Sequence, residues 1–187
     1  PALDEAAVES LRGRSMFSTT DWTAAELVTL LQVADAFEAL DRAGRRTELL
    51  RAELAYALFF DQSTRTKSAW AGAASRLGMQ PVIVDGGSTQ LSHGETAAET
   101  GAMLGMNSHA MGIRHDLILG EGNALMRDMG SGIAAYLKAT ADPRSVPIIN
   151  LQCDLDHPTQ TLADAMWLRE RFPGGLSGRK IAVSWAY

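Results

Sequence analysis

The chain has 187 residues, 46% hydrophobic and 21% charged, a composition typical of a soluble globular protein and not of a disordered or membrane-spanning one. Its 17 lysines and arginines against 22 aspartates and glutamates give a formal net charge of −5, which argues against a nucleic-acid or anionic-membrane surface. Cys153 is the only cysteine, which excludes an internal disulfide and predicts a cytoplasmic location.

The first part of the chain predicts helices that alternate with short strands. Apolar residues at helical spacing indicate the helices, and a capping box of Thr23 with Glu26 marks the start of the first one. Short apolar runs bounded by turn or polar residues indicate the strands. In chain order, the predicted elements are a helix over 23–42, a strand over 54–60, a helix over 63–77, a strand over 81–85, a helix over 94–106 and a strand over 110–114.

The second part continues this alternation after a less regular stretch at 116–145. Within that stretch, Met129, Ile133 and Leu137 indicate a helix between Gly-rich and Pro-containing ends. Pro158 suits the first turn of a later helix. The remaining predicted elements are a strand over 146–151, a helix over 158–172 and a strand over 180–184.

Strands separated by helices of this size predict the α/β class, with a parallel sheet and helices on both faces. Right-handed crossovers bring the carboxyl ends of the strands to one edge, and ligands of open α/β sheets bind outside that edge. Functional residues are therefore expected in the segments that follow the strands, namely 61–66, 85–90, 114–116 and 152–160.

The segment Ser63-Thr64-Arg65-Thr66 lies where a strand gives way to a helix. Three hydroxyls, a guanidinium and the free N–H groups of a first helical turn suit an anion the size of phosphate. The alternative is a Ser N-cap followed by ordinary surface residues, which is also a common arrangement. The Gly-x-x-x-x-Gly-Lys-Ser/Thr motif does not occur in the sequence, so a nucleotide P-loop is excluded.

A second polar segment, His157-Pro-Thr-Gln160, also follows a predicted strand. A lone histidine at a helix start is more often structural than catalytic. Arg114, at the end of another strand, favours the catalytic interpretation, because the two side chains together can donate to one developing negative oxygen. Gln160 can both donate and accept, which suits a carbamoyl or amide NH2 group.

The same region offers a metal-site alternative, because Cys153, Asp154, Asp156 and His157 are all of ligand type. Cys153 and His157 are four residues apart, a spacing that serves one metal only if both lie on one helix, and Pro158 starts the helix after Cys153. A structural cysteine with solvated aspartates is the favoured interpretation, and no metal is expected.

Three groups of residues, in this order, resemble the signatures of the aspartate and ornithine carbamoyltransferase family. An ordered set that spans most of residues 15–172 is far more specific than a single tetrapeptide. The groups are Phe59-Phe-Asp-Gln-Ser-Thr-Arg-Thr66; Ser88-Thr-Gln-Leu-Ser-His-Gly-Glu-Thr96 with Glu99-Thr100 and Met111-Gly-Ile-Arg114; and Pro147-Ile-Ile-Asn150 with His157-Pro-Thr-Gln160.

The resemblance implies a carbamoyl-phosphate-binding domain over 1–175, with 176–187 as the first strand of a second α/β domain that binds the acceptor. Family members are trimers or assemblies of trimers in which a neighbouring subunit completes each site, which implies that Gln90 acts in trans. The matching positions imply phosphate binding by Ser63, Thr64, Arg65 and Thr66, polarisation of the carbamoyl oxygen by Arg114, His157 and Thr66, and binding of the carbamoyl amino group by Gln160.

The resemblance thus predicts a carbamoyltransferase that moves the carbamoyl group of carbamoyl phosphate to an amino group of an amino acid or related amine, without a cofactor. Residues 67–70 (Lys-Ser-Ala-Trp) and 151–156 depart from the usual ornithine pattern and resemble an ornithine-carbamoyltransferase-like branch whose acceptor need not be ornithine. Two alternatives stay open, a non-catalytic anion-binding or oligomerisation module and a metal-assisted hydrolase.

Overall fold

The computed structural model of the chain describes residues 3–184. At its centre lies a sheet of four parallel strands in the order β2-β1-β3-β4, which confirms the predicted parallel sheet. The strands are β1 (Leu54–Phe59), β2 (Gln80–Asp85), β3 (Ala110–His115) and β4 (Ile148–Cys153). The helices are α1 (Glu5–Glu9), α2 (Ala24–Arg42), α3 (Arg65–Leu77), α4 (Ala97–Gly105), α5 (Gly122–Ala139) and α6 (Pro158–Arg171), with 3-10 turns at Thr19–Asp21, Gly86–Ser88 and Gln90–His93.

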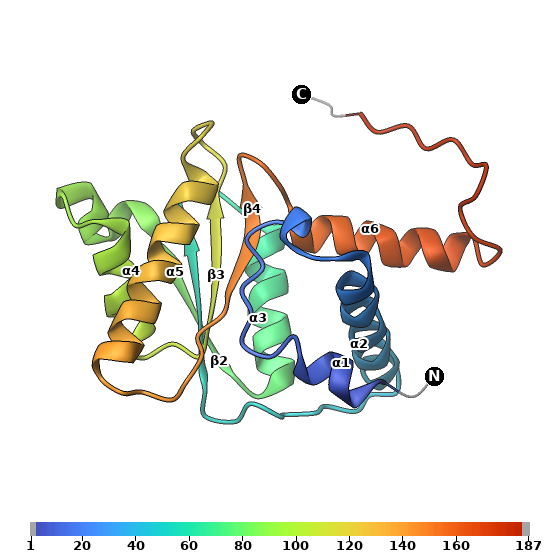
Figure 1. Cartoon of the computed structure of the whole chain (residues 1–187), viewed down its shortest axis with the longest axis horizontal. Coiled ribbons are helices and arrows are strands. Elements are labelled where there is room, and N and C mark those ends of the chain that lie inside the picture. The colour runs from blue at the N-terminus through green and yellow to red at the C-terminus, as the bar shows by residue number, and fades with distance from the viewer. Residues whose placement is uncertain (1–2, 185–187) are drawn as a thin grey trace.

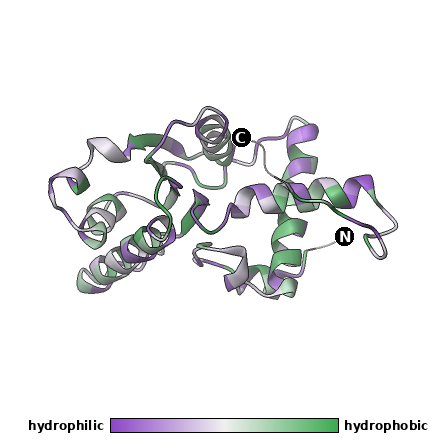
Figure 2. Cartoon of the chain, turned by 90° about the horizontal axis from the view of Figure 1, so that it is seen from above, coloured by the Kyte–Doolittle hydropathy of each residue, from purple (hydrophilic) through white to green (hydrophobic). Residues whose placement is uncertain are grey.

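Helices cover both faces of the sheet, as predicted. Figure 1 shows α4 and α5 on one side of the strands and α3, with α2 beyond it, on the other. The helices carry both purple and green segments in Figure 2, as expected for helices with one polar and one apolar side. The main core lies between the sheet and α5, and burial of each large side chain there stabilises the fold by about 1.5–3 kcal/mol. Its fully buried members are Leu58, Met111, Ile113, Met126, Met129 and Ile148.

Glycines let α4 and α5 approach each other closely. A Cβ at Gly132 would overlap the carbonyl oxygen of Ala98, and one at Gly101 would overlap that of Met129. The two backbones therefore meet directly at two points, which holds α4 beside α5 on the same face of the sheet.

The N-terminal segment is tied to β4. Met16 donates its N–H to the carbonyl of Ile148 at 2.8 Å and accepts from the N–H of Asn150 at 2.9 Å, so it pairs with the outer edge of that strand. The Asp156 carboxylate also accepts hydrogen bonds from the backbone and hydroxyl of Thr19. The free edge of β4 is thereby covered by the chain itself.

Several element boundaries differ from the sequence prediction. The helix expected over 94–106 begins only at Ala97, because a 3-10 turn ends at Gly94 in the left-handed region (φ 94°) and Thr96 starts a new capping box with Glu99. The strand expected over 146–151 begins at Ile148, because Pro147 has no N–H to donate to the ladder. The helix expected within 116–145 is α5.

The strand predicted over 180–184 is not formed. These residues are exposed and have no strand neighbour within the described part of the chain, and an isolated strand leaves its backbone groups unpaired. Figure 1 shows the segment after α6 running apart from the rest of the fold. The last part of the expected second-domain strand, residues 185–187, lies outside the described residues.

Within residues 3–184, no helix is both long enough and apolar enough to cross a membrane.

Candidate anion-binding site

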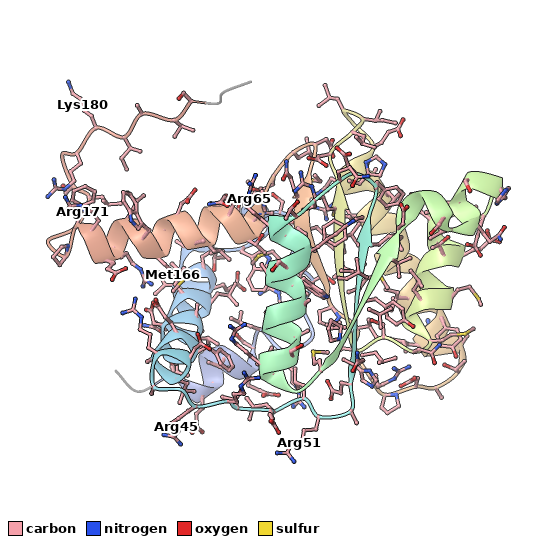
Figure 3. The ribbon with its side chains drawn as sticks, turned by 180° about the vertical axis from the view of Figure 1, so that it is seen from behind. Arg45, Arg51, Arg65, Met166, Arg171 and Lys180 are labelled. Carbon is pink, nitrogen blue, oxygen red and sulfur yellow. The ribbon has the colours of Figure 1, made fainter. Side chains whose placement is uncertain are left out.

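A polar cavity of about 270 Å³ lies outside the carboxyl ends of β1 and β3. It brings together five of the residues singled out in the sequence, four of which come from one segment and the fifth from a different strand. Figure 3 shows Arg65 at the start of α3, beside the ends of the strands. The residues that line the cavity are Gln62, Ser63, Thr64, Arg65, Thr66 and Arg114.

The start of α3 leaves its polar groups free for a ligand. Thr64 is the N-cap residue, and its side chain makes no capping hydrogen bond. The helix therefore begins one residue after Thr64, not at Ser63 as the sequence predicted. The first N–H groups of a helix have no partner within the helix, and together they carry positive potential. The exposed guanidinium of Arg65 adds a full positive charge at the same point.

Arg114 reaches this cavity from the end of β3. Its Nη1 atom lies 3.4 Å from the hydroxyl oxygens of both Ser63 and Thr66. Its Nε and Nη2 atoms donate to the two carboxylate oxygens of Asp116, at 3.3 and 3.0 Å. The side chain is only 17% exposed, so the cavity wall holds a largely buried cation that is already paired on one side.

His157 is the N-cap residue of α6 and does not line the cavity. Its ring makes no capping hydrogen bond, and its Nδ1 lies 3.3 Å from the hydroxyl oxygen of Thr159. Burial lowers the pKa of His157 below its ordinary value, and the positive charge of Arg114 lowers that pKa further. The imidazole is therefore neutral at pH 7, with one N–H to donate.

We expect the pKa of His157 to lie below the ordinary value of about 6.5 in the free protein. Added phosphate should raise this pKa, because an anion beside Arg114 offsets the positive charge that disfavours the imidazolium. NMR titration of the ring C–H signals, assigned with a His157→Gln variant, measures both values. A midpoint at or above 6.5 without phosphate would contradict the burial of His157 together with its position near Arg114.

Gln160 and Gln90 lie apart from this cavity. The amide Nε2 of Gln160 donates to Asp164 Oδ1 at 2.8 Å, so the side chain is engaged along α6. Gln90 is exposed and lines a separate open groove with Glu95 and Met103. The fold thus brings neither glutamine to the cavity of its own chain.

The aspartates considered as metal ligands in the alternative interpretation accept hydrogen bonds from the protein itself. Asp154 accepts from the backbone N–H groups of Gly120 and Asn123, and Asp156 accepts from the N-terminal segment. Burial alone would raise the pKa of Asp156, but the hydrogen bonds from Thr19, Ser18 and the backbone of His157 together lower the pKa. Among the described residues, no group of three or more His, Cys, Asp or Glu side chains is arranged to hold a metal ion.

Three residues near the cavity were not singled out from the sequence, namely Gln62, Asp116 and Gln152. Gln62 lines the cavity, Asp116 pairs with Arg114, and Gln152 donates to Asp116 at 2.8 Å. All three lie in segments that the sequence predicts to follow strands, which is the signal that could have identified them, although the structure extends β4 to include Gln152. What the sequence does not show is that Asp116 and Gln152 contact each other.

A larger hollow of about 600 Å³ lies elsewhere, between the N-terminal segment and the C-terminal half of α5. It adjoins Val146, before the start of β4, and so lies away from the carboxyl ends of the strands. Its two arginines, Arg127 and Arg144, are paired with Asp21 and Asp142. The smaller cavity is therefore the better candidate for an anion, because Arg65 there has no such carboxylate partner in the described chain.

Comparison with known proteins gives a family for this fold. The family described as "Aspartate/ornithine carbamoyltransferase, carbamoyl-P binding domain" matches residues 14–170. The chain is 41% identical, over 179 residues, to an Escherichia coli (strain K12) protein named "Putative carbamoyltransferase YgeW", with 95% of this chain and 45% of that protein covered.

Solved structures agree with this assignment. The ornithine carbamoyltransferase from Pyrococcus furiosus superposes with a TM-score of 0.73 at 30% identity, covering 90% of this chain and 48% of that one. An aspartate transcarbamoylase from Trypanosoma cruzi, in complex with carbamoyl phosphate and aspartate, gives 0.71 at 27% identity, covering 95% and 53%. The chain spans about half the length of these relatives. With its parallel sheet and the match over residues 14–170, the chain belongs to the aspartate/ornithine carbamoyltransferase family and corresponds to the carbamoyl-phosphate-binding domain.

Proposed function

We propose that this chain binds carbamoyl phosphate in the cavity at the start of α3, and that the protein transfers the carbamoyl group to an amino group. One observation carries the proposal, namely that the hydroxyls and guanidinium of 63–66 share a polar cavity with Arg114 from a neighbouring strand. A phosphate needs several donors and positive charge on one side, and a carbonyl oxygen needs a separate donor on the other. The cavity of about 270 Å³ has room for a phosphate and a carbonyl group together.

The proposed roles follow from this geometry. Ser63, Thr64, Arg65 and Thr66 hold the phosphate, and Arg114 donates from Nη1 to the carbamoyl oxygen. His157 lies outside the cavity lining and is neutral at pH 7, and it donates its N–H to the same oxygen as negative charge develops there if its ring turns toward the bound ligand. Gln160 receives the carbamoyl NH2 group if its amide leaves Asp164 when the ligand binds.

The reaction in this proposal needs no covalent intermediate with the protein. The acceptor nitrogen attacks the carbonyl carbon, and a C–N bond forms as the C–O bond to phosphate breaks. The departing phosphate takes the electron pair of the broken C–O bond and accepts the proton that the nitrogen loses. The protein contributes alignment of the reactants and stabilisation of the oxyanion and the departing phosphate.

The acceptor is proposed only as a class, an amino acid or related amine, because no group in the described chain distinguishes one amine from another. We further propose that 1–175 form the carbamoyl-phosphate-binding domain, that 176–187 lead into an acceptor-binding domain, and that the protein is a cytoplasmic homotrimer. In this proposal Gln90 contacts the cavity of a neighbouring subunit, and its exposure apart from the cavity of its own chain is the observation that agrees with this role.

A phosphate-release assay tests the function. The protein is mixed with carbamoyl phosphate and each member of a panel of amino acids and amines, and mass spectrometry identifies any carbamoylated product. We expect release that depends on one acceptor class, and much slower release from Arg65→Ala at low carbamoyl-phosphate concentration. Absence of acceptor-dependent release from the wild type would contradict transfer, and binding without turnover would favour a non-catalytic anion-binding module.

A further inference from the structure

Asp116 holds Arg114 on one side. Its carboxylate is only 18% exposed, and it takes both Nε and Nη2 of that guanidinium in a side-on pair. The pair fixes the plane of the guanidinium and leaves Nη1 as the nitrogen that faces Ser63 and Thr66. Arg114 thus presents one end, and not its two-nitrogen fork, to the cavity.

Asp116 is itself held by the sheet. The pairing of β3 with β4 is irregular, because Ile113 lies opposite Asn150 whereas Arg114 lies opposite Gln152. Leu151 is thus an extra residue on β4, and it brings Gln152 opposite Arg114. From there the side-chain amide of Gln152 donates to Asp116 Oδ2 at 2.8 Å.

This irregularity is anchored in the core. Asn150 is fully buried, and its Oδ1 accepts the backbone N–H of Gln152 at 2.9 Å. Its amide nitrogen donates to the carbonyl of Phe17 at 2.7 Å. A continuous set of hydrogen bonds therefore runs from the N-terminal segment through Asn150, Gln152 and Asp116 to Arg114.

We propose that Asp116 is a positioning residue that makes Arg114 donate through Nη1 to a single carbonyl oxygen, and leaves the phosphate to the guanidinium of Arg65. This inference rests on the function proposed above. Arg65 is exposed in the cavity with no carboxylate partner in the described chain, so its fork is available for two phosphate oxygens.

The expected effect of Asp116→Asn on carbamoyl-phosphate affinity is opposite in sign to the effect of simply removing a negative charge. Removal of a negative charge beside an anion site should strengthen the binding of any anion. If Asp116 positions Arg114, Asp116→Asn should instead weaken carbamoyl phosphate about tenfold, because the donor to the carbonyl oxygen is misplaced. Inorganic phosphate, which has no carbonyl, should bind as tightly as before or more tightly.

Calorimetry with carbamoyl phosphate and with inorganic phosphate tests this on the wild type, Asp116→Asn and Asp61→Asn. Asp61 is the matched control, since it is a carboxylate after β1 that accepts from the backbone of Gln62 and makes no hydrogen bond to Arg114 in the described chain. We expect Asp61→Asn to affect both ligands alike.

A tenfold loss confined to carbamoyl phosphate in Asp116→Asn, and absent when Arg114 is also replaced by alanine, would support the positioning role. A similar change for both ligands, or a loss that persists without Arg114, would overturn it.

A ligand-free measurement separates this inference from the proposed function. The Nε–H NMR signal of Arg114, assigned with Arg114→Lys, should be protected from solvent exchange in the wild type and exposed in Asp116→Asn. An unchanged signal would overturn the positioning role. Protection of this signal in a wild type that binds neither ligand would instead contradict the proposed function and leave the anchoring by Asp116 in place.

Discussion

Replacement of Arg65 by alanine is expected to weaken carbamoyl-phosphate binding about 10- to 100-fold, the largest effect on affinity of any single change in the cavity. Arg65 is the exposed cation at the start of α3, and hydrogen bonds to charged groups contribute about 1.5–3 kcal/mol each. Its two-nitrogen fork matches the spacing of phosphate oxygens, which the neighbouring hydroxyls cannot reproduce. Calorimetric titration of the purified variant measures the loss.

Arg51→Ala is the matched control for this experiment. Arg51 is an exposed arginine whose ion pair with Glu48 contributes little to stability, and Figure 3 shows it at the opposite end of the fold from Arg65. We expect Arg51→Ala to bind like the wild type. Equal losses in the two variants would mean that overall charge, and not the cavity, governs binding.

Replacement of His157 by alanine is expected to lower the turnover number about 10²- to 10³-fold, the usual effect of removing one donor to a developing oxyanion. Inorganic phosphate should still bind with nearly wild-type affinity, because His157 does not line the phosphate cavity. The helix should also survive, since the His157 side chain makes no capping hydrogen bond to α6. The phosphate-release assay gives the rate, and thermal melting followed by circular dichroism checks the fold.

A second variant makes the role of His157 specific. His157→Gln retains an N–H donor near the same place and should recover part of the lost rate. Turnover of His157→Ala close to that of the wild type would remove this residue from the mechanism. A large fall in melting temperature would show instead that the residue is structural.

Local patterns were enough to predict most of the fold. Met129 and Ile133 recur at helical spacing and are buried on α5, where they pack against the sheet. Right-handed crossovers bring the carboxyl ends of parallel strands to one edge of the sheet. The segment Ser63–Thr66 was therefore correctly predicted to lie at that edge. The same rule explains why Arg114, 48 residues after Thr66, could be expected nearby.

What the sequence did not predict depends on contacts between distant segments. The Asp116–Gln152 hydrogen bond exists only because β3 and β4 pair irregularly, and register shifts have no local signature. The strand expected over 180–184 was wrong because its apolar pattern says nothing about whether a neighbouring strand is present. The hydrogen bond from Gln160 to Asp164 is local, but the sequence alone cannot show which partner a surface amide selects.

An NMR titration of the backbone amides with carbamoyl phosphate tests most directly whether the cavity at the start of α3 is the ligand site. The proposal predicts saturable shifts concentrated at residues 62–66 and at Arg114, with little change around Arg127 and Arg144 in the larger hollow. Absence of saturable shifts, or shifts centred on the larger hollow, would contradict it.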